Sequence, residues 1–150
     1  MKLAVEDAVV CRGITKVYGT GPDAVQALRG IDLEVKSGEL MMLVGPSGCG
    51  KTTLISVIAG ILDQDEGTCH VFGEDVKRLS ASAKTAFRGR TVGFVFQAYN
   101  LLPALNAAEN VAVPLLIQGV KRKEAVDRAR EVLERVDLGH RWRSLPSQLS

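Results

Sequence analysis

The pattern of apolar and polar positions predicts a chain in which strands and helices alternate. Residues 8–18 and 24–35 are rich in Val and Ile and flank the loop sequence GTGPD, which is typical of short strands joined by a turn. Residues 39–45 (ELMMLVG) are a continuous apolar run, as in a strand buried on both faces of a parallel sheet. Residues 67–73 and 91–97 predict two further strands. We therefore expect an α/β fold.

Helical spacing follows the predicted strand at residues 39–45. Leu54, Val57, Ile58 and Ile61 recur at i, i+3, i+4 and i+7, which predicts an amphipathic helix. A second helix is predicted from a cap at Ser80 through about Phe87.

The last fifty residues have the character of helices rather than strands. Asn106 and Glu109 form the pattern of a capping box, and Pro114 should kink or split the helix that follows. Residues 121–139 predict the clearest helix, with Gly139 as its C-terminal cap. The side chains expected along its apolar face are Ala125, Ala129, Val132 and Val136.

Composition and charge exclude several classes of protein. The net charge of +2, from 19 basic and 17 acidic residues, is too balanced for a protein that binds nucleic acid by phosphate neutralisation. Three widely spaced cysteines, Cys11, Cys49 and Cys69, indicate neither a disulfide framework nor a zinc site. The longest apolar stretch, VAVPLLI, is far shorter than the ~20 residues that span a bilayer. We expect any membrane connection to run through another chain or segment.

The sequence GPSGCGKT at residues 45–52 carries the candidate chemistry. It fits G-x-x-x-x-G-K-[ST] and stands between a predicted strand and a predicted helix. Gly48 and Gly50 let the backbone fold around an oxyanion, Lys51 places a cation on the β- and γ-phosphates, and Thr52 offers a hydroxyl to Mg²⁺. The predicted nucleotide-binding residues of this loop are Gly45, Pro46, Ser47, Gly48, Cys49, Gly50, Lys51, Thr52 and Thr53.

Around this loop the chain resembles the nucleotide-binding subunit of an ABC transporter. The resemblance rests on KVYG with Tyr18, on GFVFQ with Gln97, and on NLLPALNAAENV after it. It implies that Tyr18 stacks on adenine and that Gln97 contacts Mg²⁺ and the attacking water, so that Gln97 acts with Lys51 in catalysis. NLLPALNAAENV would face the transmembrane partner. The wording GPDAVQALRGIDL looks most like the group of exporters that serve lipoprotein release and macrolide efflux.

The resemblance implies a fold and a setting. The fold would be an incomplete P-loop NTPase domain of the ABC type. An ATP-binding core with an antiparallel β subdomain would occupy residues 1–97, and a partial helical subdomain residues 98–150. The cofactors would be ATP and Mg²⁺. The partners would be a transmembrane permease and a second ATP-binding subunit, without nucleic acid, on the cytoplasmic face of the cell membrane. ATP would power export or release of a substrate that the permease selects.

The end of the chain bears on catalysis. Leu149 and Ser150 match the first two letters of the family's signature LSGGQ, and the family's later acidic motif and histidine switch do not occur. We therefore expect Ser150 to be a cut and the 150 residues to lack ATP hydrolysis. In the family, strands after the signature lie beside the runs at residues 39–45 and 91–97. We expect both runs to lack ladder partners here.

Other readings remain open at this point. A soluble ABC-type ATPase of translation or DNA repair usually carries long insertions, so the short spacing between Lys51 and Gln97 favours the transporter. A non-hydrolysing nucleotide-binding fragment is a further alternative. A GTPase or a small-molecule kinase would share the phosphate loop, but the guanine motif N-K-x-D of a GTPase does not occur.

Overall fold

The structure, a computed structural model, describes residues 7–149, and the chain divides into two compact units. The first unit spans Met1–Arg88 and the second Gly89–Ser150. Ser150, part of the predicted start of the signature, lies outside the described residues. No helix within residues 7–149 is both long and apolar enough to cross a bilayer.

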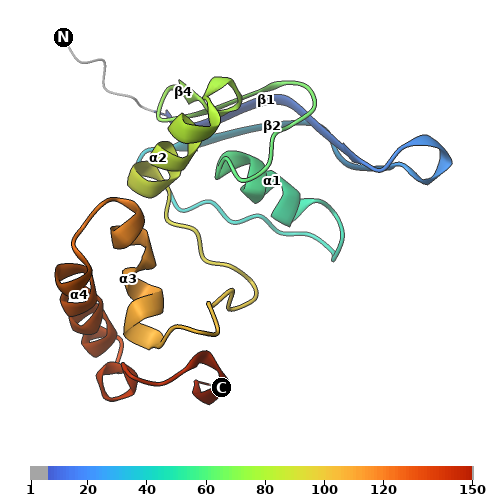
Figure 1. The fold of residues 1–150 in the computed structure, drawn as a ribbon. Helices are drawn as coiled ribbons and strands as arrows, with labels where there is room; N and C mark the ends of the chain where they lie inside the picture. The colour runs from blue at the N-terminus through green and yellow to red at the C-terminus, as the bar shows by residue number, and fades with distance from the viewer. Residues whose placement is uncertain (1–6, 150) are drawn as a thin grey trace, which may run out of the picture. The chain divides into compact units, whose positions relative to one another are not determined.

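A four-stranded antiparallel sheet forms the frame of the first unit, in the order β2-β1-β3-β4 (Figure 1). The strands predicted within residues 8–35 and 67–73 are confirmed. The strands are β1 (Asp7–Tyr18), β2 (Val25–Lys36), β3 (Thr68–Val71) and β4 (Glu74–Asp75). Short 3-10 helices are found at Gly21–Asp23, Val76–Arg78, Gly139–Arg141 and Pro146–Gln148.

The hairpin of β1 and β2 extends beyond the sheet as a two-stranded arm (Figure 1). β1 pairs with β3 only over Val9–Arg12, whereas its pairing with β2 continues to Tyr18. The register shifts between Cys11 and Ile14, around Gly13 at φ +57°. A bulge with a left-handed glycine bends a strand and increases its twist, so the arm departs from the sheet at this point.

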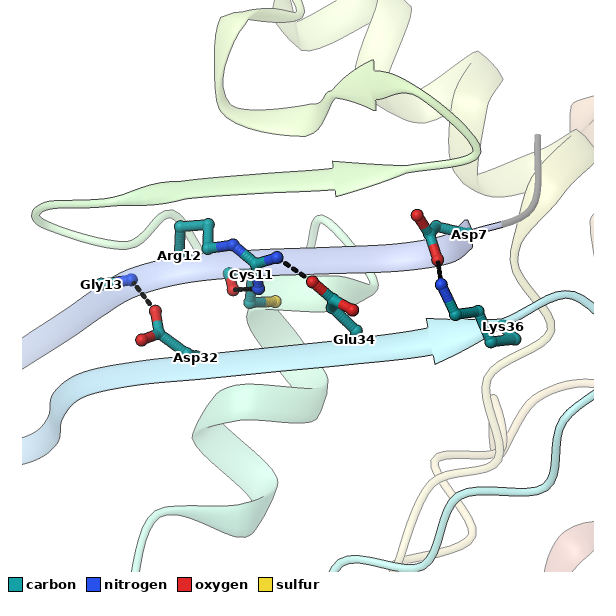
Figure 2. Close-up of polar contacts among 7 residues, drawn as sticks. All are labelled: Asp7, Cys11, Arg12, Gly13, Asp32, Glu34 and Lys36. Carbon is teal, nitrogen blue, oxygen red and sulfur yellow. Dashed lines mark hydrogen bonds and ion pairs between the residues drawn. The ribbon is translucent and has the colours of Figure 1, made fainter. Parts of the chain in front are cut away.

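Polar side chains link β1 and β2, the two strands of the hairpin (Figure 2). The N–H of Gly13 donates to Asp32 Oδ1 at 2.7 Å. Arg12 pairs with Glu34, and Lys36 pairs with Asp7 nearer the end of the sheet. Exposed ion pairs of this kind contribute about 0–1 kcal/mol each, so they set the pairing register more than the stability.

Helix α1 (Lys51–Ile58) packs against β2 and β3, and this contact forms the core of the first unit. Full burial of a Leu, Ile or Phe side chain contributes about 1.5–3 kcal/mol, and most of the unit's stability comes from such residues. The buried side chains of the unit include Cys11, Ile14, Leu28, Leu54, Val57, Cys69, Val71, Val76 and Phe87.

Helix α2 (Ala81–Thr91) begins where the sequence predicts. The hydroxyl of Ser80 accepts from the N–H of Ala83 at 3.3 Å, as an N-cap does. The helix continues to Thr91, four residues past the predicted end at Phe87.

In the second unit, two helices pack through alanines. Helices α3 (Ala107–Ile117) and α4 (Arg122–Arg135) are joined by a short loop and bury small side chains against each other. Because most of the buried positions in the seam are alanines, the two backbones can approach closely. The buried residues are Ala107, Ala108, Ala112, Ala125, Ala129 and Leu133.

The apolar face predicted for residues 121–139 is only partly correct. Ala125 and Ala129 are buried, but Val132 and Val136 are 47% and 58% exposed. Leu133 takes the buried position instead, because it continues the i, i+4 spacing from Ala125 and Ala129.

The predicted capping box at the start of α3 is confirmed. Asn106 Oδ1 accepts from the N–H of Glu109 at 2.9 Å, and Glu109 Oε2 accepts from the N–H of Asn106 at 3.1 Å. The same hydrogen bond from Asn106, with the guanidinium of Arg122, holds the pKa of Glu109 below its ordinary value. The expected split at Pro114 does not occur: α3 runs through Pro114 to Ile117.

The cap of α4 differs from the prediction. The helix ends at Arg135, and Asp137 rather than Gly139 takes the left-handed conformation, at φ +61°. The N–H of Asp137 donates to Glu134 O at 3.1 Å and that of Leu138 to Leu133 O at 2.8 Å. This is a Schellman motif in which an aspartate occupies the position usually held by glycine.

The two apolar runs predicted as buried strands are not strands. Residues 39–45 and 92–96 have no regular structure, and within residues 7–149 neither run pairs with a strand. Leu40 is 88% exposed, Val44 86% and Val95 95%. The strand assignments are wrong, and the expectation that both runs lack ladder partners is confirmed. An apolar run becomes a buried strand only where neighbouring strands accept and donate its backbone hydrogen bonds.

The cap of α4 yields a stability prediction. Asp137→Gly should raise the free energy of unfolding by about 0.5–1 kcal/mol, because glycine adopts φ > 0 without strain and the change removes a negative charge at a helix C-terminus. Chemical denaturation of both proteins measures the difference. Asp137→Ala should lower stability instead, and a stabilising effect of alanine would contradict the strain argument.

Candidate functional site

The phosphate loop at residues 45–50 leads directly into helix α1. Gly50 is the N-cap at φ +91°, and Lys51 is the first helical residue. No side chain caps this end of the helix, and the N–H of Leu54 donates to the carbonyl oxygen of Gly50 at 2.9 Å. The N–H groups of Lys51, Thr52 and Thr53 therefore point out of the helix without intrahelical acceptors, as an anion-binding terminus requires.

Gly50 makes a close approach that no other residue type allows. A Cβ on this glycine would lie 2.4 Å from the carbonyl oxygen of Ala27 and 3.1 Å from Leu28 Cδ2, both on β2. The start of α1 is thus set directly against the hairpin. Gly48 also has positive φ, +81°, but a Cβ there would meet no atom within 4 Å. Gly48 serves the turn of the loop, while Gly50 serves both the turn and the packing.

The ammonium of Lys51 lies among the carbonyl groups of the loop. Its Nζ donates to Gly45 O at 2.8 Å and to Pro46 O at 2.7 Å, and lies 3.5 Å from Cys49 Sγ. The side chain therefore folds back over the loop instead of pointing away from it. This places a positive charge and the free N–H groups of the helix on the same few residues, the combination that binds a phosphate group.

A mostly apolar groove of about 420 Å³ adjoins the first turn of α1. Thr52 is exposed at its edge next to Lys51, so its hydroxyl is accessible. Within residues 7–149, no cluster of three or more His, Cys, Asp or Glu side chains could hold a metal ion. The residues that line the groove are Val9, Leu33, Val35, Met41, Leu43, Lys51, Thr52, Ile55 and Ile58.

Tyr18 ends β1 on the arm of the hairpin. It pairs with Val25 of β2 and is 45% exposed. Two residues further along β2 is Ala27, whose carbonyl lies against Gly50. The hairpin thereby carries Tyr18 in the same unit as the phosphate loop and near the strand position that the loop contacts.

Asp65, which no sequence motif indicates, holds this part of β1 in place. Asp65 Oδ2 accepts from the N–H of Val17 at 2.7 Å, and Oδ1 accepts from Lys16 Nζ at 2.7 Å. The N–H of Asp65 donates in turn to Thr15 O at 2.9 Å. The hydrogen bonds from Lys16 and Val17 hold the pKa of Asp65 below its ordinary value, so it is ionised at neutral pH. In the sequence, Asp65 is one of three acidic residues in the loop DQDEG, and only the fold brings it to β1.

Gln97 belongs to the second unit, whereas Tyr18 and the phosphate loop belong to the first. Gln97 lies in a bend after the unpaired run at residues 92–96 and is exposed. In that run the rings of Phe94 and Phe96 contact each other, with centroids 4.7 Å apart. The structure thus places Tyr18 and the loop residues in one unit and Gln97 in the other.

A family model for the ABC transporter matches residues 28–150 of the chain. The chain belongs to the ABC transporter family. The match begins within β2, so it includes the phosphate loop and Gln97 but not Tyr18. The sequence-based recognition of this family is confirmed, and with it the fold class.

Relatives with curated names come from the same family. The chain is 46% identical over 97% of its length to the lipoprotein-releasing system ATP-binding protein LolD 2 of Caulobacter vibrioides. It is 47% identical over 91% to LolD of Geobacter metallireducens, and 46% identical over 91% to an uncharacterized ABC transporter ATP-binding protein of Thermotoga maritima. The chain spans 64%, 61% and 58% of the length of these three curated relatives.

A solved structure of an ABC ATP-binding cassette has a similar fold. The ATP-binding cassette MJ0796, described as a dimeric post-hydrolysis state bound to ADP and Pi, superposes with a TM-score of 0.88 at 34% identity. The superposition covers 95% of this chain and 63% of that chain.

The two glycines of the ABC phosphate loop should respond differently to alanine. Gly50→Ala should lower the free energy of unfolding by about 2–4 kcal/mol, because it adds a clash with Ala27 to the strain of positive φ. Gly48→Ala should cost only about 1 kcal/mol, since strain acts there without a clash. Urea denaturation of both variants measures the contrast, and equal losses would contradict the close approach of Gly50 to β2.

Proposed function

We propose that this chain is the ATP-binding part of an ABC transporter and that it binds Mg-ATP through residues 45–53. The observation that carries the proposal is the arrangement around Lys51. Its ammonium lies within hydrogen-bonding distance of two loop carbonyls, directly beside the free N–H groups at the start of α1. At Gly50 only glycine fits, and this lets the start of α1 lie directly against β2. These features fit a polyphosphate chain.

The loop residues have separate tasks in this proposal. The N–H groups from Gly48 to Thr53 donate to phosphate oxygens, and Lys51 exchanges the loop carbonyls for the β- and γ-phosphates. The hydroxyl of Thr52, exposed at the edge of the groove, would hold the magnesium ion together with Gln97. A bound Mg²⁺ would supply positive charge against the phosphates.

Two residues outside the loop complete the proposed site. Tyr18, half-exposed on the hairpin arm, offers a ring face on which adenine can stack, and Asp65 keeps that end of β1 in position. Gln97 would contact the magnesium ion and orient the attacking water. Gln97 lies on the second compact unit, whereas the phosphate loop and Tyr18 lie on the first.

The biological setting is part of the proposal. Relatives at 46% and 47% identity are named as lipoprotein-releasing system ATP-binding proteins, which supports a role in lipoprotein release or in a related export process. The chain would work with a transmembrane permease, which selects the substrate, at the cytoplasmic face of the membrane. The dimeric state of the cassette MJ0796 supports pairing with a second ATP-binding subunit. The curated relatives are transporter components, which supports this reading over a soluble ABC-type ATPase of translation or DNA repair.

The nucleotide site can be tested at Lys51. A charged hydrogen bond is worth about 1.5–3 kcal/mol, so Lys51→Ala should weaken Mg-ATP binding by about 10–100-fold. Isothermal titration calorimetry measures the affinity. Lys123→Ala, which removes a lysine from the second unit, is the matched control and should leave the affinity unchanged. Equal affinity in wild type and Lys51→Ala would overturn the proposed site.

We further expect these 150 residues to bind ATP without turning it over. Hydrolysis requires a base or positioner for the water and stabilisation of the γ-phosphoryl charge. Gln97 is a neutral amide, which can orient water but cannot take its proton, and loss of general-base help costs about 10²–10⁴-fold.

Phosphate release from the 150-residue chain should therefore stay at the background set by Lys51→Ala. A longer relative such as LolD 2 of Caulobacter vibrioides serves as the positive control. Turnover of about one per second that depends on Lys51 would be ordinary for an enzyme and would contradict this expectation.

A further inference from the structure

Two of the three cysteines face each other across the middle of the sheet. Cys11 on β1 and Cys69 on β3 are direct partners in the antiparallel register, and their Sγ atoms lie 3.7 Å apart. Both side chains are fully buried. β1 and β3 are the two inner strands of the sheet, so the pair lies in its interior rather than at an edge.

The third cysteine has a different environment. Cys49 is exposed in the phosphate loop, and its Sγ lies 3.5 Å from Lys51 Nζ. The spacing of the three cysteines in the sequence does not indicate which of them pair. The fold places Cys11 opposite Cys69 and leaves Cys49 apart.

The positions of Cys11 and Cys69 suit a covalent bond between them. Directly opposed residues on antiparallel strands have Cα atoms about 4.5–5.5 Å apart, within the range of about 4.4–6.8 Å seen across disulfides. Only the sulfurs have to move, from 3.7 Å to a bond of about 2.05 Å. Rotation of two side chains about their Cα–Cβ bonds can close such a gap without moving either strand.

We propose that Cys11 and Cys69 are an oxidisable dithiol and that a two-electron oxidant converts them to an intramolecular disulfide. With a diazene oxidant such as diamide, the thiolate of one cysteine adds to the N=N bond. The sulfur of the other then attacks the sulfur of this adduct, forms the S–S bond and releases a hydrazine. The two thiol hydrogens and two electrons end on the hydrazine nitrogens, so the reaction balances.

The pair differs in which thiol ionises first. The hydrogen bond with Cys69 lowers the pKa of Cys11, whereas the hydrogen bond with Cys11, together with burial, raises the pKa of Cys69. The direction of both shifts makes Cys11 the thiol of the pair that ionises more readily. Figure 2 shows Cys11 on β1, its carbonyl contacted by the guanidinium of Arg12.

The disulfide would tie together segments that are far apart in the chain. Cys11 and Cys69 are 58 positions apart, and the closed loop contains the β1–β2 arm, the phosphate loop and α1. A cross-link over a loop of this length restricts the unfolded chain strongly. Oxidation should stabilise the unit that holds the proposed nucleotide site without placing any new group in that site.

The test uses the wild-type chain and peptide mapping. Iodoacetamide first caps exposed Cys49 under native conditions, diamide is then added, and trypsin digests the protein without reduction. Trypsin places each cysteine in its own peptide, because cleavage follows Lys and Arg: residues 3–12, 37–51 and 52–77. We expect the peptides 3–12 and 52–77 to be joined, two hydrogen atoms lighter than their sum, and released by dithiothreitol.

Thermal unfolding supplies the second readout. The oxidised protein should unfold roughly 5–15 °C higher than the reduced protein, and dithiothreitol should reverse the shift. Cys11→Ala and Cys69→Ala are matched variants, each of which should lose both the linked peptides and the shift. Failure of diamide to join peptides 3–12 and 52–77 in the folded wild-type protein would overturn the proposal, as would a linked protein that is less stable than the reduced one.

Discussion

The proposed nucleotide site depends on one steric constraint, the contact between the backbone of Gly50 and the carbonyl of Ala27. A Cβ at this glycine would lie 2.4 Å from that oxygen, so the start of α1 meets β2 at a distance that excludes any side chain. This contact orients the unpaired N–H groups of the helix and keeps Lys51 over the loop. The hairpin is therefore a support for the loop as well as the carrier of Tyr18.

A second support acts on β1 from the loop that follows α1. Asp65 accepts hydrogen bonds from Lys16 and from the N–H of Val17, immediately before Tyr18. These hydrogen bonds hold the pKa of the Asp65 carboxyl below its ordinary value. The β1–β2 arm extends past the last pairing with β3, and there Asp65 and its neighbour Glu66 bind β1 at Thr15, Lys16 and Val17. Its end is thus tied to the segment that leaves the phosphate-loop helix.

The second unit is stabilised by alanine packing between its helices and by polar contacts at the helix ends. Small side chains in the seam of α3 and α4 let the helices pack closely, and the carboxylate of Glu109 serves three purposes there. It completes the capping box with Asn106, pairs with Arg122 at the start of α4, and places a negative charge at a helix N-terminus. Polar contacts of Glu109 and alanine packing along the seam therefore hold α3 and α4 together.

Local rules determined much of this protein from its sequence. The phosphate loop was predictable because its glycines and lysine act through backbone conformation and charge at fixed spacing, and the capping box at Asn106 because its hydrogen bonds are local. Only the tertiary structure decided the fate of residues 39–45 and 92–96, the clamp at Asp65 and the pairing of Cys11 with Cys69. Each of these depends on which distant backbone or side-chain atoms are available as partners, and hydrophobic periodicity carries no information about partners.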